Sequence, residues 1–325
     1  MKKTLFLVFI LAVFFIPFLV TGQVRDSDIN LSLSPLYPAP FQDVRAVLSS
    51  QTVDLNKTLI SWSLDGQVTI RGVGKKDFQF KAGALGSVTN ITASIETIEG
   101  VSLQKNISVK PAEIDMLWEA PDSYVPPFYK GKALASSQSK LKVVAMPSFM
   151  TEGGMVKNTN LSYIWSKDGK SQSQYSGWGK NYIIFQNSYL DRQNEVSVQV
   201  SDITGNMKAG GLTNLTTGNP KILFYRSDPI FGTDWGRALS TEYSINPDGE
   251  TIIAEPYFFS EKNVTSPNIS MKWFLNGQEI DNPAPKNALS LILQTGEKGT
   301  AIIKTTVENT KALFQESSKE LRLNF

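Results

Sequence analysis

Trp62-Ser-Leu-Asp65-Gly66 is the stretch that decides the fold, because the chain repeats its pattern twice more. The later copies are Trp165-Ser-Lys-Asp168-Gly169 and Trp273-Phe-Leu-Asn276-Gly277, and the three Trp are 103 and 108 residues apart. One immunoglobulin-like β-sandwich takes about 100 residues. A repeat of this period therefore predicts tandem modules of that kind, and it says nothing by itself about chemistry.

The residues around each signature alternate between apolar and polar, which is typical of half-buried strands. No segment of useful length has helical periodicity. The expected strands come in four sets of three: 59–62, 161–165 and 269–273, which lead into the Trp; 77–80, 182–185 and 289–293; 88–95, 196–200 and 301–307; 103–109, 211–215 and 320–325. A polar stretch is expected between each signature and the second set. The fold class is predicted to be all-β.

Each signature predicts a core residue and a turn. The Trp corresponds to the buried Trp on the third strand of an immunoglobulin-like sandwich. The Asp-Gly or Asn-Gly pair indicates a tight turn, since Gly tolerates positive φ. The structural residues are therefore the core residues Trp62, Trp165 and Trp273 and the turn residues Asp65, Gly66, Asp168, Gly169, Asn276 and Gly277.

The repeat divides the chain into tandem immunoglobulin-like modules at 28–110, 112–218 and 219–325, after an N-terminal segment at 1–22. The links near Lys110-Pro111 and Gly218-Asn219-Pro220 contain Pro, whose fixed φ stiffens the chain. We expect a semi-rigid rod of three modules.

The first 22 residues are typical of an export signal. Lys2 and Lys3 precede an apolar run from Thr4 to Val20, and small residues follow up to Gly22. Cleavage after Gly22 is one reading, and an uncleaved membrane anchor over residues 4–20 is the other. No later run is apolar for long enough to span a membrane. We expect an exported protein that is at the cell surface, periplasmic or secreted, with the membrane reached only through residues 4–20.

Composition excludes several kinds of chemistry. The chain has no Cys and no His, which removes disulfides, thiolate metal sites, Cys nucleophiles and Ser–His–Asp triads. No cofactor and no metal are predicted. Without residues 1–22, the 30 basic and 30 acidic side chains balance, which argues against nucleic acid as a partner. We predict that the chain is not an enzyme; the alternative from that class is a carbohydrate-active protein with two carboxylates in an aromatic cleft.

Exposed aromatic residues are the candidates for ligand contact. Pro-rich residues 124–131 hold Tyr124, Phe128 and Tyr129, which could contact a sugar or an extended strand or could close the end of the second sandwich. Residues 225–236, with Trp235, form the corresponding aromatic stretch of the third module. Trp178 lies between two Gly and could be a contact residue or could cover its own sheet.

Two carboxylate-containing turns, at 202–206 and 246–250, could supply oxygens to calcium at module junctions. Neither has the density of ligands of an established calcium loop, and turn chemistry accounts for both.

The stretch Trp118-Glu-Ala-Pro-Asp-Ser-Tyr-Val-Pro-Pro-Phe-Tyr-Lys-Gly-Lys-Ala133 resembles uncharacterised exported immunoglobulin-like or PKD-like proteins of small-genome candidate-phyla bacteria. The resemblance runs through all three modules. It implies a cell-surface location and a link to pilus or secretion machinery, and it supplies no site residues.

Taken together, these features predict a non-enzymatic, exported cell-envelope protein for adhesion, spacing or protein–protein interaction. The expected partner is an envelope or surface protein, with carbohydrate as another candidate. An accessory subunit of a pilus or secretion assembly is the alternative.

Overall fold

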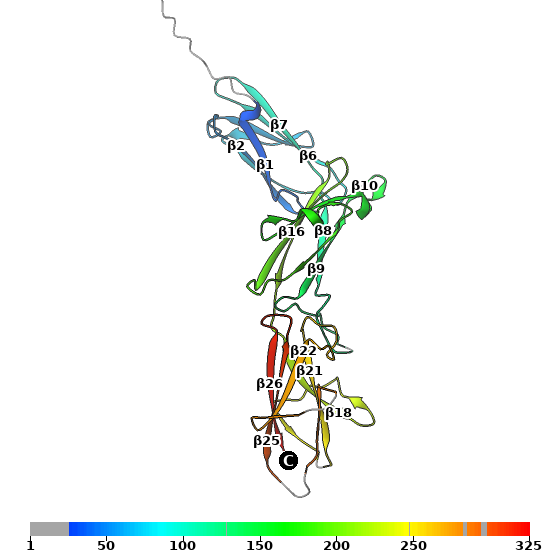
Figure 1. Cartoon of the computed structure of the whole chain (residues 1–325). Coiled ribbons are helices and arrows are strands. Elements are labelled where there is room, and N and C mark those ends of the chain that lie inside the picture. The colour runs from blue at the N-terminus through cyan, green and yellow to red at the C-terminus, as the bar shows by residue number, and fades with distance from the viewer. Residues whose placement is uncertain (1–25, 128, 247, 282–284, 294–297) are drawn as a thin grey trace, which may run out of the picture. The chain divides into compact units, whose positions relative to one another are not determined.

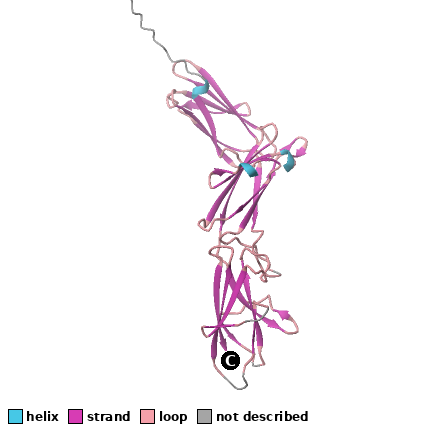
Figure 2. Ribbon diagram, in the orientation of Figure 1, coloured by secondary structure: helices cyan, strands magenta, loops and turns pink. Residues whose placement is uncertain are grey.

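The fold is all-β. The computed structural model describes residues 26–127, 129–246, 248–281, 285–293 and 298–325. Within these residues the helical segments are three short 3-10 turns at Asp26–Asp28, Asn158–Asn160 and Ser173–Tyr175, and strands form the rest of the regular structure (Figure 2). No helix in the described ranges is long and apolar enough to span a membrane. The predicted signal or anchor at 1–22 lies outside those ranges.

The chain divides into two compact units, and the first holds one sandwich. This unit contains Asp43–Phe80, Thr89–Val109 and the described residues up to Leu36. One sheet has the order β1-β2-β5, with strands Ile29–Ser34, Asp43–Ser50 and Asp77–Lys81. The other has the order β4-β3-β6-β7, with strands Gln67–Val73, Leu59–Leu64, Thr89–Glu96 and Ser102–Val109. The rings of Trp62 and Phe78 stack between the sheets, 5.5 Å apart.

The second unit contains Tyr37–Gln42, Lys81–Val88 and Lys110–Phe325, and it holds two sandwiches. In its first sandwich, one sheet is β15-β9-β8, with strands Tyr182–Gln186, Lys140–Ser148 and Glu113–Glu119. The facing sheet is β13-β12-β16-β17, with strands Lys170–Ser171, Ser162–Lys167, Gln193–Ser201 and Lys208–Thr216; β14 (Gly177–Trp178) also pairs with β12. A two-stranded hairpin, β10 (Met150–Thr151) and β11 (Gly154–Met155), lies apart from both sheets. Side chains of both sheets form one core around Trp165.

The third sandwich follows the same plan (Figure 1). One sheet is β19-β18-β21-β24, with strands Gly232–Thr233, Lys221–Asp228, Glu250–Tyr257 and Ala288–Leu291. The other is β20-β26-β25-β22-β23, with strands Glu242–Ser244, Glu316–Asn324, Thr300–Asn309, Ile269–Leu275 and Gln278–Ile280. The β20–β26 pair is parallel. Phe224 and Trp273 meet in the core, with ring centres 6.1 Å apart.

The three signature Trp are buried in the same way. Trp62, Trp165 and Trp273 are 0, 0 and 1% exposed. Each indole Nε1–H donates to a Lys carbonyl of its own sandwich, at 2.7 Å for Trp62, 2.8 Å for Trp165 and 2.9 Å for Trp273. The indole thus reaches the core with its polar atom satisfied, as a buried Trp requires.

The three turns are also alike. Asp65, Asp168 and Asn276 have φ of 47°, 49° and 49°, and the Gly after each also has positive φ. Two consecutive positive φ values are those of a type I′ hairpin turn. Each side-chain Oδ1 accepts the amide of a residue at the neighbouring strand: Asn90 at 2.7 Å, Glu195 at 2.9 Å and Ile302 at 2.9 Å. The turn is thereby tied to the next strand of the sheet.

One local expectation was wrong. The polar stretch predicted after the first turn is strand β4, seven residues long, which pairs with β3. All of its residues are exposed except Gly72, which is half-buried. Because neither face is buried, the strand does not require the apolar–polar alternation by which the other strands were predicted. The corresponding strands β13 and β23 have only two and three residues.

Candidate functional site

Residues 120–127 and 129–135 follow strand β8 and form a segment held by hydrogen bonds. Both carboxylate oxygens of Asp122 accept a hydrogen bond from the backbone N–H of Lys140, at 3.0 and 2.9 Å. The hydroxyl of Ser123 donates to the carbonyl of Leu134 at 2.6 Å, which closes the segment on itself. Burial raises the pKa of the Asp122 carboxyl, although the Lys140 amide lowers it.

This segment covers the outer face of the third sandwich. In the β18–β21 pair, Leu223 lies opposite Glu255 and Tyr225 opposite Ile253, on the face that points away from the core. Tyr225, Glu255 and Tyr257 are nonetheless buried. The backbone of Tyr124 supplies part of the cover: its amide donates to the carbonyl of Phe259 at 2.8 Å, and its carbonyl accepts the amide of Phe258 at 2.7 Å.

A buried carboxylate lies under the segment. Glu255 is 2% exposed, and its two oxygens accept hydrogen bonds from the Tyr124 hydroxyl and from Asn287 Nδ2, the latter at 3.3 Å. Burial raises the pKa of the Glu255 carboxyl above its ordinary value, although these two hydrogen bonds lower it. Burial and the bond to Glu255 also raise the pKa of Tyr124.

Aromatic rings fill the remaining space. The Tyr129 ring meets Tyr257 edge to face, with centres 5.5 Å apart, and it meets Phe258 at 6.2 Å. The Tyr225 hydroxyl shares a hydrogen bond with that of Tyr257, and Trp235 lies 5.2 Å from Tyr225. Edge-to-face pairs stabilise beyond the area they bury, by about 0.5–1.5 kcal/mol each.

A second contact joins the two sandwiches nearby. Gln315, 1% exposed, donates to the carbonyl of Ser137 and to the hydroxyl of Ser260, the latter at 2.6 Å. The amide of Leu313 donates to Gln138 Oε1 at 2.7 Å. We call the whole contact the junction: residues 120–127 and 129–135 with Ser137 and Gln138, against β18, β21, Trp235 and the β25–β26 turn at 313–315.

The junction gathers three of the five ligand-contact candidates. Tyr124 and Tyr129 belong to the covering segment and contact the third sandwich, and Trp235 packs against Tyr225 within that sandwich. Trp178 lies elsewhere, in β14, and is 55% exposed. Phe128 lies outside the described residues. The aromatic stretches of the two modules are not equivalent: residues 225–236 are a strand and hairpin that receive the segment, because Tyr225 belongs to β18.

Several junction residues were missed in the sequence. The signal for some of them was the run 254–259, Ala-Glu-Pro-Tyr-Phe-Phe, where the alternation of β21 fails and every residue is buried. A strand buried on both faces near its end indicates a cover supplied from elsewhere in the chain. Gln315 and Ser137 gave no signal, since their contact depends on how two turns meet.

In both carboxylate-containing turns, a carboxylate already has partners within the protein. Asp202 accepts the amide of Met207 at 3.0 Å and the hydroxyl of Thr204. Glu250 accepts the hydroxyl of Tyr243 at 2.7 Å and pairs with Arg226. Within the described ranges, no three His, Cys, Asp or Glu residues are grouped so that they could hold a metal ion.

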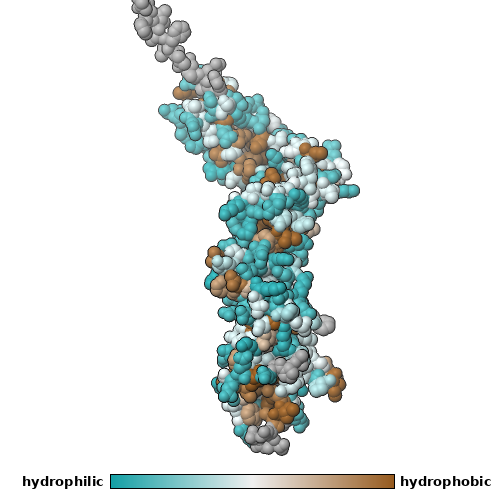
Figure 3. Space-filling model, in the orientation of Figure 1, coloured by the Kyte–Doolittle hydropathy of each residue, from teal (hydrophilic) through white to brown (hydrophobic). Residues whose placement is uncertain are grey.

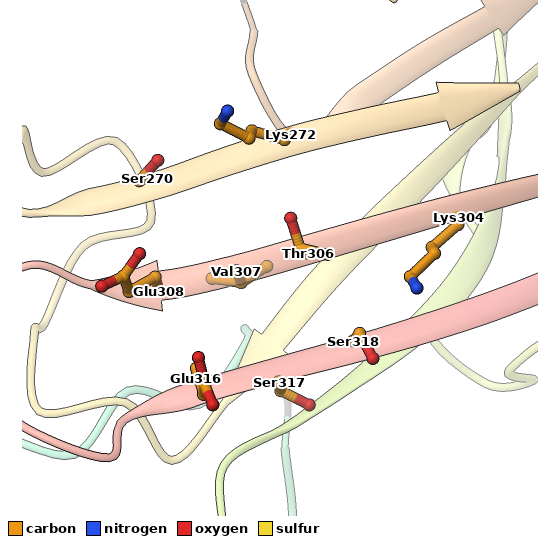
Figure 4. A pocket seen from close by; sticks show the side chains of 9 residues that line it. All are labelled: Ser270, Lys272, Lys304, Thr306, Val307, Glu308, Glu316, Ser317 and Ser318. Atoms are coloured by element: carbon orange, nitrogen blue, oxygen red, sulfur yellow. The ribbon is translucent and has the colours of Figure 1, made fainter. Parts of the chain in front are cut away.

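A hollow of about 500 Å³ lies on the outer face of β22, β25 and β26, and its lining is polar except for Val307 (Figure 4). Glu308 and Glu316 stand opposite each other in the register, but no aromatic side chain lines the hollow. Lys272 and Lys304 at its other end pair with Glu279 and Glu320. The hollow therefore lacks the aromatic walls of the carboxylate cleft that a glycosidase would need.

No protein-family model matches the chain, and no curated protein sequence matches it. Solved structures of tandem β-modules are similar to it. One is the three N-terminal domains of the highly immunogenic outer capsid protein of bacteriophage RB49, with 11% identity, a TM-score of 0.27, and coverage of 91% of this chain and 97% of that one. Another is the central fibronectin-III array of RIM-binding protein, with 11% identity, a TM-score of 0.29, and coverage of 91% and 95%. The fibronectin(III)-like modules of Clostridium thermocellum CbhA give 14%, 0.28, and coverage of 58% and 93%. At such TM-scores these likenesses carry no argument about function.

Proposed function

We propose that this chain is a non-enzymatic, exported protein that presents binding surfaces at fixed separation, for adhesion, spacing or protein–protein interaction at the cell envelope. The observation that carries the proposal is the junction, in which a hydrogen bond from Tyr124 to the buried carboxylate of Glu255 and a packed aromatic cluster join two sandwiches. A chain that only needed flexible spacing would not require a buried carboxylate between its modules.

Export rests on the sequence. The apolar run after Lys2 and Lys3 and the absence of Cys and His fit a non-catalytic protein of the envelope. The resemblance to exported immunoglobulin-like or PKD-like proteins of small-genome bacteria belongs to the same proposal.

Location is tested by fractionating the cells that produce the protein, treating intact cells with protease, and sequencing the N-terminus of the mature chain. We expect the chain to be cleaved by protease on intact cells or found in the periplasm or medium. A chain that starts at Met1 and remains in the cytoplasm would refute the proposal.

Fixed separation is tested by distance measurement. Because the chain has no Cys, the double variant Lys170→Cys and Lys272→Cys takes spin labels only at these two exposed positions, one on each sandwich of the second unit. We expect electron–electron double resonance to give one narrow distance distribution. Adding Tyr124→Ala and Gln315→Ala should broaden it. A label pair within one sandwich is the control, and a broad distribution in the unmodified junction contradicts the proposal.

A further inference from the structure

A second hollow, also of about 500 Å³, opens beside the junction. Four parts of the chain line it: Ser137 before β9, the loop between β15 and β16, the link between the two sandwiches at 217–219, and the β25–β26 turn. Its walls therefore come from both sandwiches of the second unit, and the hollow exists only while these are docked. None of the candidates named from the sequence lies in it.

Two aromatic rings form one wall. Tyr189 and Phe314 have ring centres 5.8 Å apart with planes tilted by 32°, and they are 47% and 69% exposed. Phe314 has a φ of 58°, which is uncommon for a bulky residue. The hydrogen bonds of Leu313 and Gln315 to Gln138 and Ser137 hold the chain on either side of it. The ring is thus held toward solvent, in a strained conformation of the kind that gathers at binding sites.

Polar groups without partners complete the hollow. The hydroxyl oxygen of Ser137 is buried and has no hydrogen-bond partner among the described residues. The side chains of Asp191, Arg192 and Asn219 also line the hollow, and in the described part of the chain none of them makes a hydrogen bond or an ion pair. Because the Ser137 hydroxyl is buried, it lies behind the wall of the hollow, and a ligand would meet Asp191, Arg192 and Asn219 instead.

We propose that this hollow binds a neutral oligosaccharide. The apolar face of a sugar ring packs against an exposed aromatic ring, while its hydroxyls pair with planar carboxylate, guanidinium and amide groups. The rim carries one carboxylate, Asp191, and one guanidinium, Arg192, so charge complementarity favours a ligand without net charge. The lining comes from loops and side chains, with no free strand edge along which an extended peptide could pair.

The proposal deepens the proposed function and rests on it, because the binding surface depends on the fixed junction. Bound ligand would contact both sandwiches and stabilise their docking by mass action. The two proposals can fail separately. A narrow distance distribution without sugar binding would refute the oligosaccharide site and leave the proposal of a fixed junction standing.

The test starts with the purified full chain on an array of neutral oligosaccharides, followed by titration calorimetry with chitohexaose, cellohexaose and maltohexaose. We expect at least one sugar to bind with a millimolar or lower Kd. Tyr189→Ala should weaken binding about tenfold. Phe314→Gly should do the same without a folding defect, because Gly accepts the positive φ of that position.

The matched control is Trp178→Ala, which removes an exposed aromatic ring from another part of the second unit and should leave affinity unchanged. Three results would overturn the proposal: no sugar binds, Phe314→Gly binds as well as the unmodified chain, or Trp178→Ala abolishes binding. Capture of an acidic sugar in place of neutral ones would also overturn the assigned ligand class.

Discussion

The Tyr124 hydroxyl, carried by the second sandwich, donates a hydrogen bond to the buried carboxylate of Glu255 in the third. The two residues are 131 positions apart, and the bond closes the long loop of chain between them. Glu255 is buried and Tyr124 half-buried, so losing the Tyr124 hydroxyl leaves a buried carboxylate oxygen without this donor.

The first prediction concerns that bond. Tyr124→Phe keeps the ring and removes the hydroxyl, so Glu255 loses a donor. We expect the free energy of unfolding to fall by about 1–3 kcal/mol, measured by urea denaturation. Tyr182→Phe, at an exposed tyrosine on β15, should change it by less than about 0.5 kcal/mol. Equal effects in the two variants would mean that the bond does not stabilise the junction.

The second prediction is a pH dependence. The pKa of Glu255 is raised by burial above its ordinary value of 4.5. A carboxyl with a raised pKa binds its proton more tightly in the folded state, so its stabilising contribution is complete below pH 4.5 and is lost as pH rises through the raised pKa.

Glu255→Gln removes this titration while keeping an acceptor for Tyr124. The difference in Tm between Glu255→Gln and the unmodified chain should therefore grow as pH rises from 4.5 and then level off. Other carboxyls titrate equally in both proteins and cancel in the difference. A difference that stays constant with pH would show that Glu255 titrates normally.

The third prediction concerns the core. Trp165→Ala should lower the free energy of unfolding by about 3–5 kcal/mol, because it leaves a cavity and frees the carbonyl of Lys180. Trp178→Ala is the control, since that ring is exposed, and its effect should stay below about 0.5 kcal/mol. Chemical denaturation followed by circular dichroism measures both.

The fourth prediction concerns the turn. Asp168→Ala removes the acceptor for the Glu195 amide and places Ala at positive φ, so it should cost about 1–2 kcal/mol. Asp168→Asn keeps one oxygen in the same place and should be nearly neutral, because Asn276 does this work in the third sandwich. A cost for Asn equal to that for Ala would show that the charge matters and not the hydrogen bond.

Sequence alone predicted the architecture better than the site. The three Trp and the three turns gave the all-β class, because burial of Trp and positive φ at Gly are local requirements that leave a local pattern. The junction was not predicted, because Tyr124 contacts residues more than 130 positions away. No prediction was made from the run Ala254 to Phe259, and its burial and the covering residues 120–127 and 129–135 came only from the three-dimensional structure.

Apolar side chains also lie exposed away from the junction, such as Ile230 and Phe231 at the β18–β19 hairpin. The face seen in Figure 3 mixes hydrophilic and apolar areas. More than half of a folded protein's accessible surface is ordinarily apolar, so these two residues alone do not indicate a binding site.

The third turn carries Asn276 where the other two carry Asp, and this difference affects its chemical stability. Asn followed by Gly is the sequence in which an amide side chain cyclises onto the backbone and deamidates most readily. Conversion of Asn276 to aspartate would only reproduce the residue that the other two turns already carry. Conversion to isoaspartate would add a methylene to the backbone of the turn. The two positive φ values of a two-residue turn do not accommodate that extra atom. Deamidation should therefore begin in the third sandwich, at the turn that follows β22 and its Trp273.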